Sequence, residues 1–128
     1  ALQAYAKADL QLYQNKKEEA LQLFLAILQK HKGESIEEGT LFKVGKIYEE
    51  KGDFNKALSY YQNILDNHKD GIYKDEALYF SAEIYRKHLL DNEKAKALYE
   101  KVVLEHPDSL YYTESRKQYR TLRGDSTI

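Results

Sequence analysis

Residues 41–65 read LFKVGKIYEEKGDFNKALSYYQNIL, with a turn at Gly52-Asp53 near the middle. On each side of the turn, apolar residues recur at steps of three and four, which is the period of an amphipathic helix. They are Leu41, Val44, Ile47 and Tyr48 before the turn, and Ala57, Tyr60, Tyr61, Ile64 and Leu65 after it. The stretch therefore predicts two helices that fold back on each other as a pair.

The pattern of this pair returns when the chain is shifted by 37 residues, or by 38 residues towards its end. Small residues, aromatic residues and histidines each fall into register three times. The aligned sets are Ala8, Gly45 and Ala82; Ala20, Ala57 and Ala95; Phe24, Tyr61 and Tyr99; Ile27, Ile64 and Val102; and His31, His68 and His106. Small residues allow helices to approach closely, and the aromatic residues fill the space beside them. The extra residue of the third unit must lie between Tyr85 and Ala95.

Turn and cap residues divide the chain into about seven predicted helices, as expected for a sequence that is poor in Gly and Pro. We predict helices near residues 2–14, 17–31, 35–51, 54–68, 73–88, 91–105 and 109–123. The predicted N-caps are Asp53, Asp91, a capping box of Ser35 with Glu38, and Asp108 or Ser109 after Pro107, with Gly33, Gly71 and Gly124 as helix stops. The fold class that follows is all-α.

The middle unit resembles a tetratricopeptide repeat (TPR), in which a bulky residue, Leu-Gly, Tyr, Ala and Phe stand at fixed offsets before a Pro. The matching residues are Leu41, Val44-Gly45, Tyr48, Ala57 and Tyr61 in the middle unit; Leu78, Ala82, Tyr85, Ala95, Tyr99 and Pro107 in the third; and Ala20 and Phe24 in the first. In the first unit Ala4, Ala8 and Gln11 replace the usual Trp, Gly and Tyr. The resemblance implies an α-solenoid, a superhelix of antiparallel helix pairs.

One TPR domain over residues 1–123 is the organisation that this resemblance implies. Its repeats would span about residues 1–34, 35–71 and 72–108, and a capping helix would follow at 109–123. Residues 124–128 would form a flexible tail. Residue 1 is Ala rather than Met, which is typical of an excised domain or a processed chain.

The long units and the C-terminal segment EHPDSLYYTESRKQYRTLRGD resemble a second, narrower group. These are bacterial cell-envelope proteins of the TolA-binding and outer-membrane assembly lipoprotein type. Their Pro-x-Ser-x-hydrophobic motif leads into a basic closing helix. The resemblance implies a scaffold in the periplasm or at the outer membrane, in preference to the cytoplasm.

Composition excludes several classes of function. The formal net charge of −1 argues against nucleic acid as the main partner, because nucleic-acid-binding domains carry a strong basic excess. The absence of cysteine excludes disulfides, thiolate metal sites and thiol chemistry. Apolar residues never run on long enough for a transmembrane segment.

The TPR resemblance implies a concave groove lined by the first helix of each pair. The candidate groove residues are Tyr5, Asp9 and Tyr13 in the first unit; Phe42, Lys46 and Glu49 in the second; and Tyr79, Phe80, Glu83, Arg86 and Lys87 in the third. Aromatic anchors mixed with both signs of charge suit a protein or peptide partner, and Lys46, Arg86 and Lys87 are placed to orient its carboxylates. The alternative is that the aromatic residues pack between adjacent repeats.

The family's chaperone-tail clamp of Lys, Asn, Asn, Lys and Arg is not expected here. The corresponding residues are Tyr5, Asp9, Lys43, Glu76 and Phe80, and none of them matches.

The predicted closing helix carries four cations, Arg116, Lys117, Arg120 and Arg123, of which three share a face by their spacing. An acidic protein or anionic headgroups could dock there. The alternative is the polar outer face of a capping helix. Leu110, Tyr111, Ser115, Tyr119 and Leu122 are expected to face the preceding repeat.

No catalytic or cofactor-binding pattern accompanies these features. The three aligned histidines lie one repeat apart, too far for one metal, and each suits a helix C-terminus, where the dipole favours a cation. Adjacent carboxylates face different sides of a helix, and the glycines are scattered singly. The sequence therefore predicts a protein without enzymatic activity, metal or cofactor.

Two functions stay open at this stage. The first is a scaffold that binds a peptide or helix of a partner in the concave groove. The second is a structural segment of a longer solenoid, or a self-associating module. Tyr5, Leu10 and Leu12 favour the second function, because a terminal helix with no neighbour should be polar.

Overall fold

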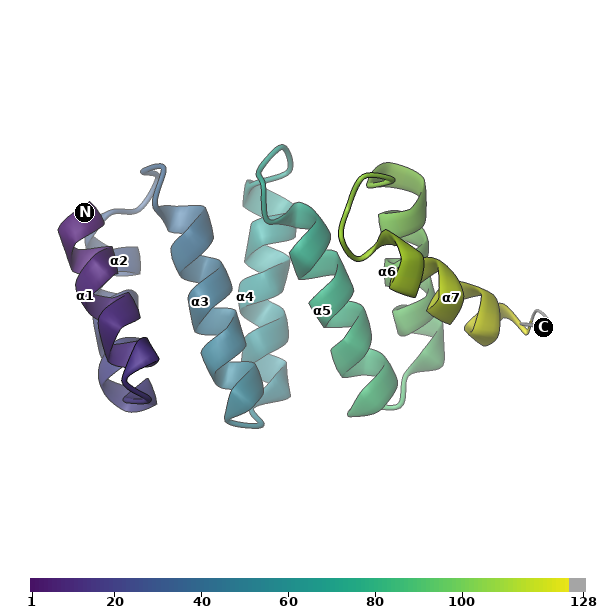
Figure 1. Cartoon of the computed structure of the whole chain (residues 1–128), viewed down its shortest axis with the longest axis horizontal. Coiled ribbons are helices and arrows are strands. Elements are labelled where there is room, and N and C mark those ends of the chain that lie inside the picture. The colour runs from purple at the N-terminus through teal and green to yellow at the C-terminus, as the bar shows by residue number, and fades with distance from the viewer. Residues whose placement is uncertain (125–128) are drawn as a thin grey trace. The chain divides into compact units, whose positions relative to one another are not determined.

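The computed structural model describes residues 1–124, and these residues form seven α-helices and no strand (Figure 1). The helices are α1 (Leu2–Tyr13), α2 (Lys17–Lys30), α3 (Glu37–Glu50), α4 (Phe54–Asn67), α5 (Lys74–Lys87), α6 (Asn92–Glu105) and α7 (Tyr112–Arg123). The predicted all-α helical-repeat fold is confirmed, and the predicted helix ends agree within a few residues.

The chain divides into two compact units. The first comprises Ala1–His68 and contains α1 to α4, in which α1 packs against α2, α2 against α3, and α3 against α4. The second comprises Lys69–Ile128 and contains α5 to α7, in which α5 packs against α6 and α6 against α7. The single domain predicted over residues 1–123 stays a prediction.

The second helix of a pair begins at an aspartate in both later repeats. The side chain of Asp53 accepts a hydrogen bond from the backbone N–H of Lys56 at 3.3 Å, and Asp91 accepts one from Lys94 at 3.1 Å. These bonds satisfy N–H groups that have no partner inside the helix. Both N-caps predicted from the sequence are confirmed.

The first helices of the pairs begin differently, and the predicted capping box of Ser35 and Glu38 is wrong. The N-cap of α3 is Ile36, and no side chain caps it. A backbone turn satisfies the first N–H group of the helix instead, since Glu37 N–H donates to the carbonyl oxygen of Glu34 at 3.0 Å. The helix therefore starts two residues later than predicted.

The predicted cap of α7 by Asp108 or Ser109 is also wrong, because α7 starts after Tyr111 without a side-chain cap. Ser109 Oγ donates to Asp75 Oδ2 at 2.6 Å and accepts from Tyr111 N–H at 3.0 Å. This serine ties the turn to α5, so it is engaged in a tertiary contact.

Gly71 does not end a helix, because α4 ends at Asn67 with His68 as C-cap. The stop at Gly124 is confirmed, since this residue closes α7 at a left-handed φ of 94°. The predicted tail beyond it, residues 125–128, lies outside the described residues.

The core of the first unit is centred on contacts between aromatic and small residues. Phe24, Tyr61 and Ala8 are fully buried, and Gly45 is buried beside Tyr61. Ala8 belongs to the same core cluster as Phe24. A Cβ atom added to Gly45 would come within 2.6 Å of Tyr61 Cε1, so only glycine leaves room for this ring. In the second unit Tyr99 packs into one cluster with Ala82 and Ala95.

The turn inside each pair repeats one unusual backbone conformation. Asn15, Gly52 and Leu90 occupy equivalent positions and have positive φ angles of 63°, 82° and 54°. Asparagine and glycine tolerate this region, whereas leucine pays a steric cost there. Leu90 follows Leu89, and this segment accommodates the extra residue that was predicted between Tyr85 and Ala95.

We expect Gly45→Ala to destabilise the protein. The added methyl group must displace the buried ring of Tyr61, at a cost of about 1–3 kcal/mol. The higher helix propensity of alanine offsets about 1 kcal/mol of this cost. Thermal and urea unfolding followed by circular dichroism measure the net loss. In a Tyr61→Leu background the loss should shrink, and an unchanged loss would contradict the proposed clash.

We expect Leu90→Gly to stabilise the protein by up to about 1 kcal/mol. The left-handed conformation costs a leucine about 1–2 kcal/mol, and the greater freedom of glycine in the unfolded chain offsets part of the gain. Leu89→Gly is the matched control in the same turn. It should lower stability, because Leu89 does not have a positive φ. Equal effects of the two substitutions in urea unfolding would argue against strain at Leu90.

Candidate functional site

One stripe along α5 gathers all the candidate groove residues of the third repeat. Glu76, Tyr79, Phe80, Glu83, Arg86 and Lys87 follow at helical spacings of three and four, which places them on one face. The stripe runs from an acidic end, through an aromatic centre, to a basic end. These residues are half-buried, except Lys87, which is exposed.

The aromatic centre of the stripe includes a ring from the closing helix. Tyr111, the N-cap of α7, stacks on Tyr79 with ring centroids 4.5 Å apart and an interplanar angle of 19°. Phe80 meets Tyr111 edge to face at 5.5 Å, and meets Tyr79 at 5.4 Å. Such contacts fix ring orientations beyond what apolar burial alone provides. Three rings from two helices thus form one cluster in the second unit.

The sequence missed Tyr111 as a site residue. It predicted only that Tyr111 faces the preceding repeat, together with Leu110, Ser115, Tyr119 and Leu122. Ser115 is buried, and Tyr119 and Leu122 pack on the cluster around Tyr99. Leu110 is 94% exposed, so the prediction for this residue is wrong. The start of α7 at Tyr112 leaves Leu110 in the preceding turn.

Glu83 is the electrostatic centre of the stripe. Its Oε2 accepts hydrogen bonds from Tyr99 Oη and, at 3.0 Å, from Arg86 Nη2, while its Oε1 lies 3.0 Å from Lys87 Nζ. Arg86 Nε also donates to Tyr99 Oη at 3.0 Å. Burial alone would raise the pKa of Glu83, but the donors Tyr99, Lys87 and Arg86 outweigh it and hold this pKa below its ordinary value.

The tyrosines beside Glu83 respond in the opposite direction. Burial, followed by the charge of Glu83, raises the pKa of Tyr79 to about 12. Burial and the hydrogen bond to Glu83 also raise the pKa of Tyr99. Both phenols therefore stay neutral through the physiological range, and Tyr99 acts as a hydrogen-bond donor.

The second repeat has the same arrangement with the charges exchanged. Tyr61 Oη donates to Glu49 Oε1 at 2.8 Å, and Lys46 Nζ lies 3.7 Å from the same oxygen. Lys46 aligns with Glu83, and Glu49 aligns with Arg86. In both repeats a buried tyrosine of the second helix reaches an i, i+3 ion pair on the first helix.

The remaining candidate groove residues lie in the compact unit Ala1–His68, and most of them are engaged in packing or ion pairs. Tyr5 packs edge to face on Phe24 at 5.5 Å, and Phe42 lies 6.1 Å from Tyr61. Both ring contacts lie within a repeat, whereas the alternative drawn from the sequence placed these aromatic residues between adjacent repeats. Asp9 on α1 pairs with Lys43 on α3 at 3.1 Å, whereas Tyr13 is 89% exposed.

The four cations of the closing helix do not form a uniform surface. Arg116 and Lys117 are exposed, and Arg120 is half-buried. The guanidinium group of Arg123 lies over the ring of Tyr119, 4.9 Å from its centroid, and donates to Tyr119 Oη at 3.4 Å. Part of the predicted basic face is therefore used within α7.

The aligned histidines cap the second helix of each pair. His31, His68 and His106 are the C-caps of α2, α4 and α6. His31 Nδ1 lies 2.8 Å from Glu34, and His68 Nε2 lies 3.0 Å from Glu37. Within residues 1–124 no three histidines or carboxylates are placed to hold a metal ion together. Over the same residues, no helix is long and apolar enough to cross a membrane.

We expect the aromatic centre to lose stability at alkaline pH. A raised pKa means that Tyr79 contributes fully below the ordinary pKa of about 10, and that this contribution is lost as pH rises through about 12. The thermal midpoint should therefore fall more steeply between pH 10 and 12 in the parent than in Tyr79→Phe. At 295 nm the variant should lack one late-titrating phenol of the folded parent. In 6 M guanidinium all phenols of both proteins should titrate near pH 10, and only the total absorbance change should differ, by one tyrosine. Identical titrations would contradict the assignment.

Comparison with known proteins gives the family of this chain. The family model described as tetratricopeptide repeat matches residues 40–71 and 76–109, just over half of the chain. Among solved structures, a tetratricopeptide repeat protein from Parabacteroides merdae aligns with a TM-score of 0.49 and 18% identity. The alignment covers 95% of this chain and 61% of that one. No curated protein matches. The chain belongs to the tetratricopeptide repeat family.

Proposed function

We propose that this chain is a non-catalytic protein-interaction module, and that the stripe on α5 binds a short peptide segment of a partner. Tetratricopeptide repeats generally mediate protein–protein interactions and are typically non-catalytic scaffolds. The observation that carries the proposal is the ring cluster of Tyr79, Phe80 and Tyr111 between charges of opposite sign.

The order of charges along α5 supports a peptide with a matching order. Glu76 precedes the rings, and the same acidic end includes Asp75, since both carboxylates raise the pKa of Tyr111 in addition to its burial. Arg86 and Lys87 follow the rings. The preferred peptide therefore carries a basic residue, an apolar or aromatic residue, and an acidic residue in turn.

The length of the stripe fixes the spacing of these residues. Glu76 and Lys87 are separated by eleven positions, or about 16 Å along a helix axis. An extended peptide advances about 3.3 Å per residue. The two charged residues of the peptide should therefore stand about five positions apart, with the apolar residue between them.

The cationic end is suited to weak, selective binding. Glu83 already pairs with both Arg86 and Lys87, so one positive charge remains in surplus there. An exposed ion pair contributes only about 0.2–1 kcal/mol. The rings should therefore supply most of the affinity, and the charges should set orientation and partner choice.

Self-association is the second candidate function. Leu2 and Tyr13 on α1 are 79% and 89% exposed, which favours an unfilled contact surface on this helix. The periplasmic or outer-membrane location stays a prediction.

Peptide binding tests the first candidate. Fluorescence anisotropy should detect a labelled peptide with a lysine, a central phenylalanine and a glutamate in the spacing above. Phe80→Ala should weaken binding by at least about tenfold, because it removes part of the ring cluster. Lys87→Glu should weaken it by about three- to fivefold, by loss of one exposed ion pair.

The design includes a rescue and a control. A peptide whose glutamate is replaced by lysine should bind the Lys87→Glu variant better than it binds the parent. Lys101→Glu on the exposed side of α6 carries the same charge change and should have no effect. Circular dichroism verifies that each variant is folded. Failure of the rescue, with all variants folded, would overturn the proposed orientation.

A further inference from the structure

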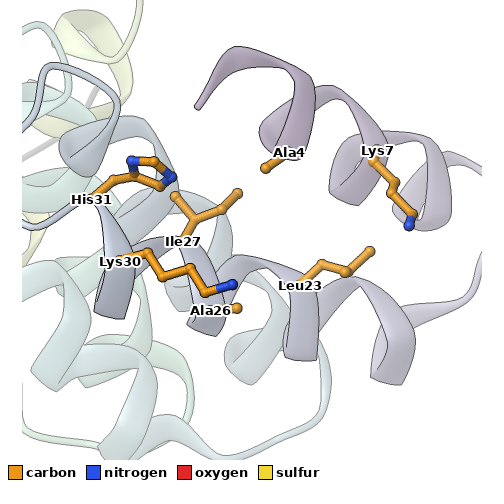
Figure 2. A pocket seen from close by; sticks show the side chains of 7 residues that line it. All are labelled: Ala4, Lys7, Leu23, Ala26, Ile27, Lys30 and His31. Atoms are coloured by element: carbon orange, nitrogen blue, oxygen red, sulfur yellow. The ribbon is translucent and has the colours of Figure 1, made fainter.

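A hollow of about 210 Å³ lies between α1 and α2. Its floor and walls are mainly apolar, formed by Ala4 from α1 and by Leu23, Ala26 and Ile27 from α2. Lys7, Lys30 and His31 stand at its rim. Figure 2 shows Lys7 reaching from one helix toward Leu23, while Lys30 lies alongside Ala26 on the other.

The internal repeat identifies the kind of element that fits this face. The equivalents of Lys7 and Leu10 one repeat later are Val44 and Ile47, and both are fully buried in a cluster with residues of α2. Tyr60, the equivalent of Leu23, packs against the same cluster. On the second helix pair this face is thus covered by a helix, namely α2. On the first pair Leu10 is 52% exposed.

The size of the hollow favours a side-chain anchor over a small molecule. Pockets for small ligands typically measure about 300–1,000 Å³, and this one falls below that range. A few aliphatic side chains on one face of a helix would fill it. An amphipathic helix laid in an apolar groove is a common mode of recognition.

The rim selects the charge of that helix. Lysine replaces the valine found at the equivalent position of α3, so the covering helix must meet an ammonium group. His31 is already engaged with Glu34 at 2.8 Å, which leaves Lys7 and Lys30 to bind carboxylates. Two exposed cations at the rim favour an acidic partner and discriminate against a basic one.

The same charges argue against a second copy of the chain as the occupant. The closing helix of another copy would bring Arg116, Lys117 and Arg120 toward Lys7 and Lys30. A twofold contact through α1 would bring Lys7 and Lys30 of both copies into one interface. Both arrangements set like charges against each other, which costs free energy.

We propose that the hollow between α1 and α2 binds an acidic amphipathic helix of a partner protein. Aliphatic side chains of that helix enter between Ala4, Leu23 and Ala26, and its carboxylates pair with Lys7 and Lys30. This surface is separate from the α5 stripe, and the proposal does not depend on peptide binding there.

A nuclear magnetic resonance titration of the ¹⁵N-labelled chain tests the proposal. The probe is a synthetic helix of about 14 residues with leucines on one face and glutamates on the other. Amide shifts should concentrate at Ala4, Leu23 and Ala26. The double variant Lys7→Glu with Lys30→Glu should weaken binding by at least tenfold and should prefer a probe in which lysines replace the glutamates. The control, Lys16→Glu with Lys101→Glu, makes the same net charge change elsewhere and should bind as the parent does.

The remaining outcomes overturn the proposal. Equal binding of the glutamate and lysine probes by the parent would mean that Lys7 and Lys30 do not select the occupant. Amide shifts confined to Tyr79, Phe80 and Tyr111 would mean that the probe helix binds the α5 stripe and not the hollow. A mass well above 15.0 kDa in light scattering, with the amides of Ala4 and Leu23 shielded in the free protein, would assign the hollow to a second copy.

Discussion

The close approach of an aromatic ring to a small residue is the constraint on which each helix pair depends. Phe24, Tyr61 and Tyr99 occupy the same repeat position on the second helices, and all three are fully buried. Each needs a facing residue without a long side chain, and the contact is tightest at Gly45. Because interiors are close-packed, an added methyl group cannot be absorbed freely at such a contact. The size pattern therefore sets how closely two helices of a pair can lie.

The same packing also brings a tyrosine hydroxyl of the second helix to a carboxylate of the first helix. A tyrosine held against a small residue carries its hydroxyl to the first helix of the pair, where a polar group must accept its hydrogen bond. Tyr61 donates to Glu49, and Tyr99 donates to Glu83. In the repeat alignment, Glu49 stands one helical turn later on its helix than Glu83 does. A buried donor tolerates a carboxylate at either position, so the order of acid and base is free to change between repeats. The structural core thereby leaves the order of acidic and basic residues on the first helix free to differ between repeats.

Local patterns predicted most of the fold, whereas tertiary contacts decided what they missed. Asp53 caps its own helix through a residue three positions away, so the sequence alone is sufficient. Ser109 has the same capping chemistry but bonds to Asp75, 34 residues away, which no local pattern reveals. Tyr111 stacks on Tyr79 across a similar separation in sequence. The residues of the α5 stripe could thus be proposed from helical spacing alone, while their ring cluster and the several bonds of Glu83 required the structure.

The face of α1 and α2 around the hollow can be buried only by a neighbouring element, because each repeat buries part of its surface against its neighbours. A pure cap would place polar residues throughout this face. Lys7 meets that requirement, since it is an exposed cation at the edge of the hollow. Leu10 and the apolar lining at Leu23 and Ala26 do not meet it. A face with cations at its rim and aliphatic residues at its centre fits a site for an acidic helix better than it fits a sealed end.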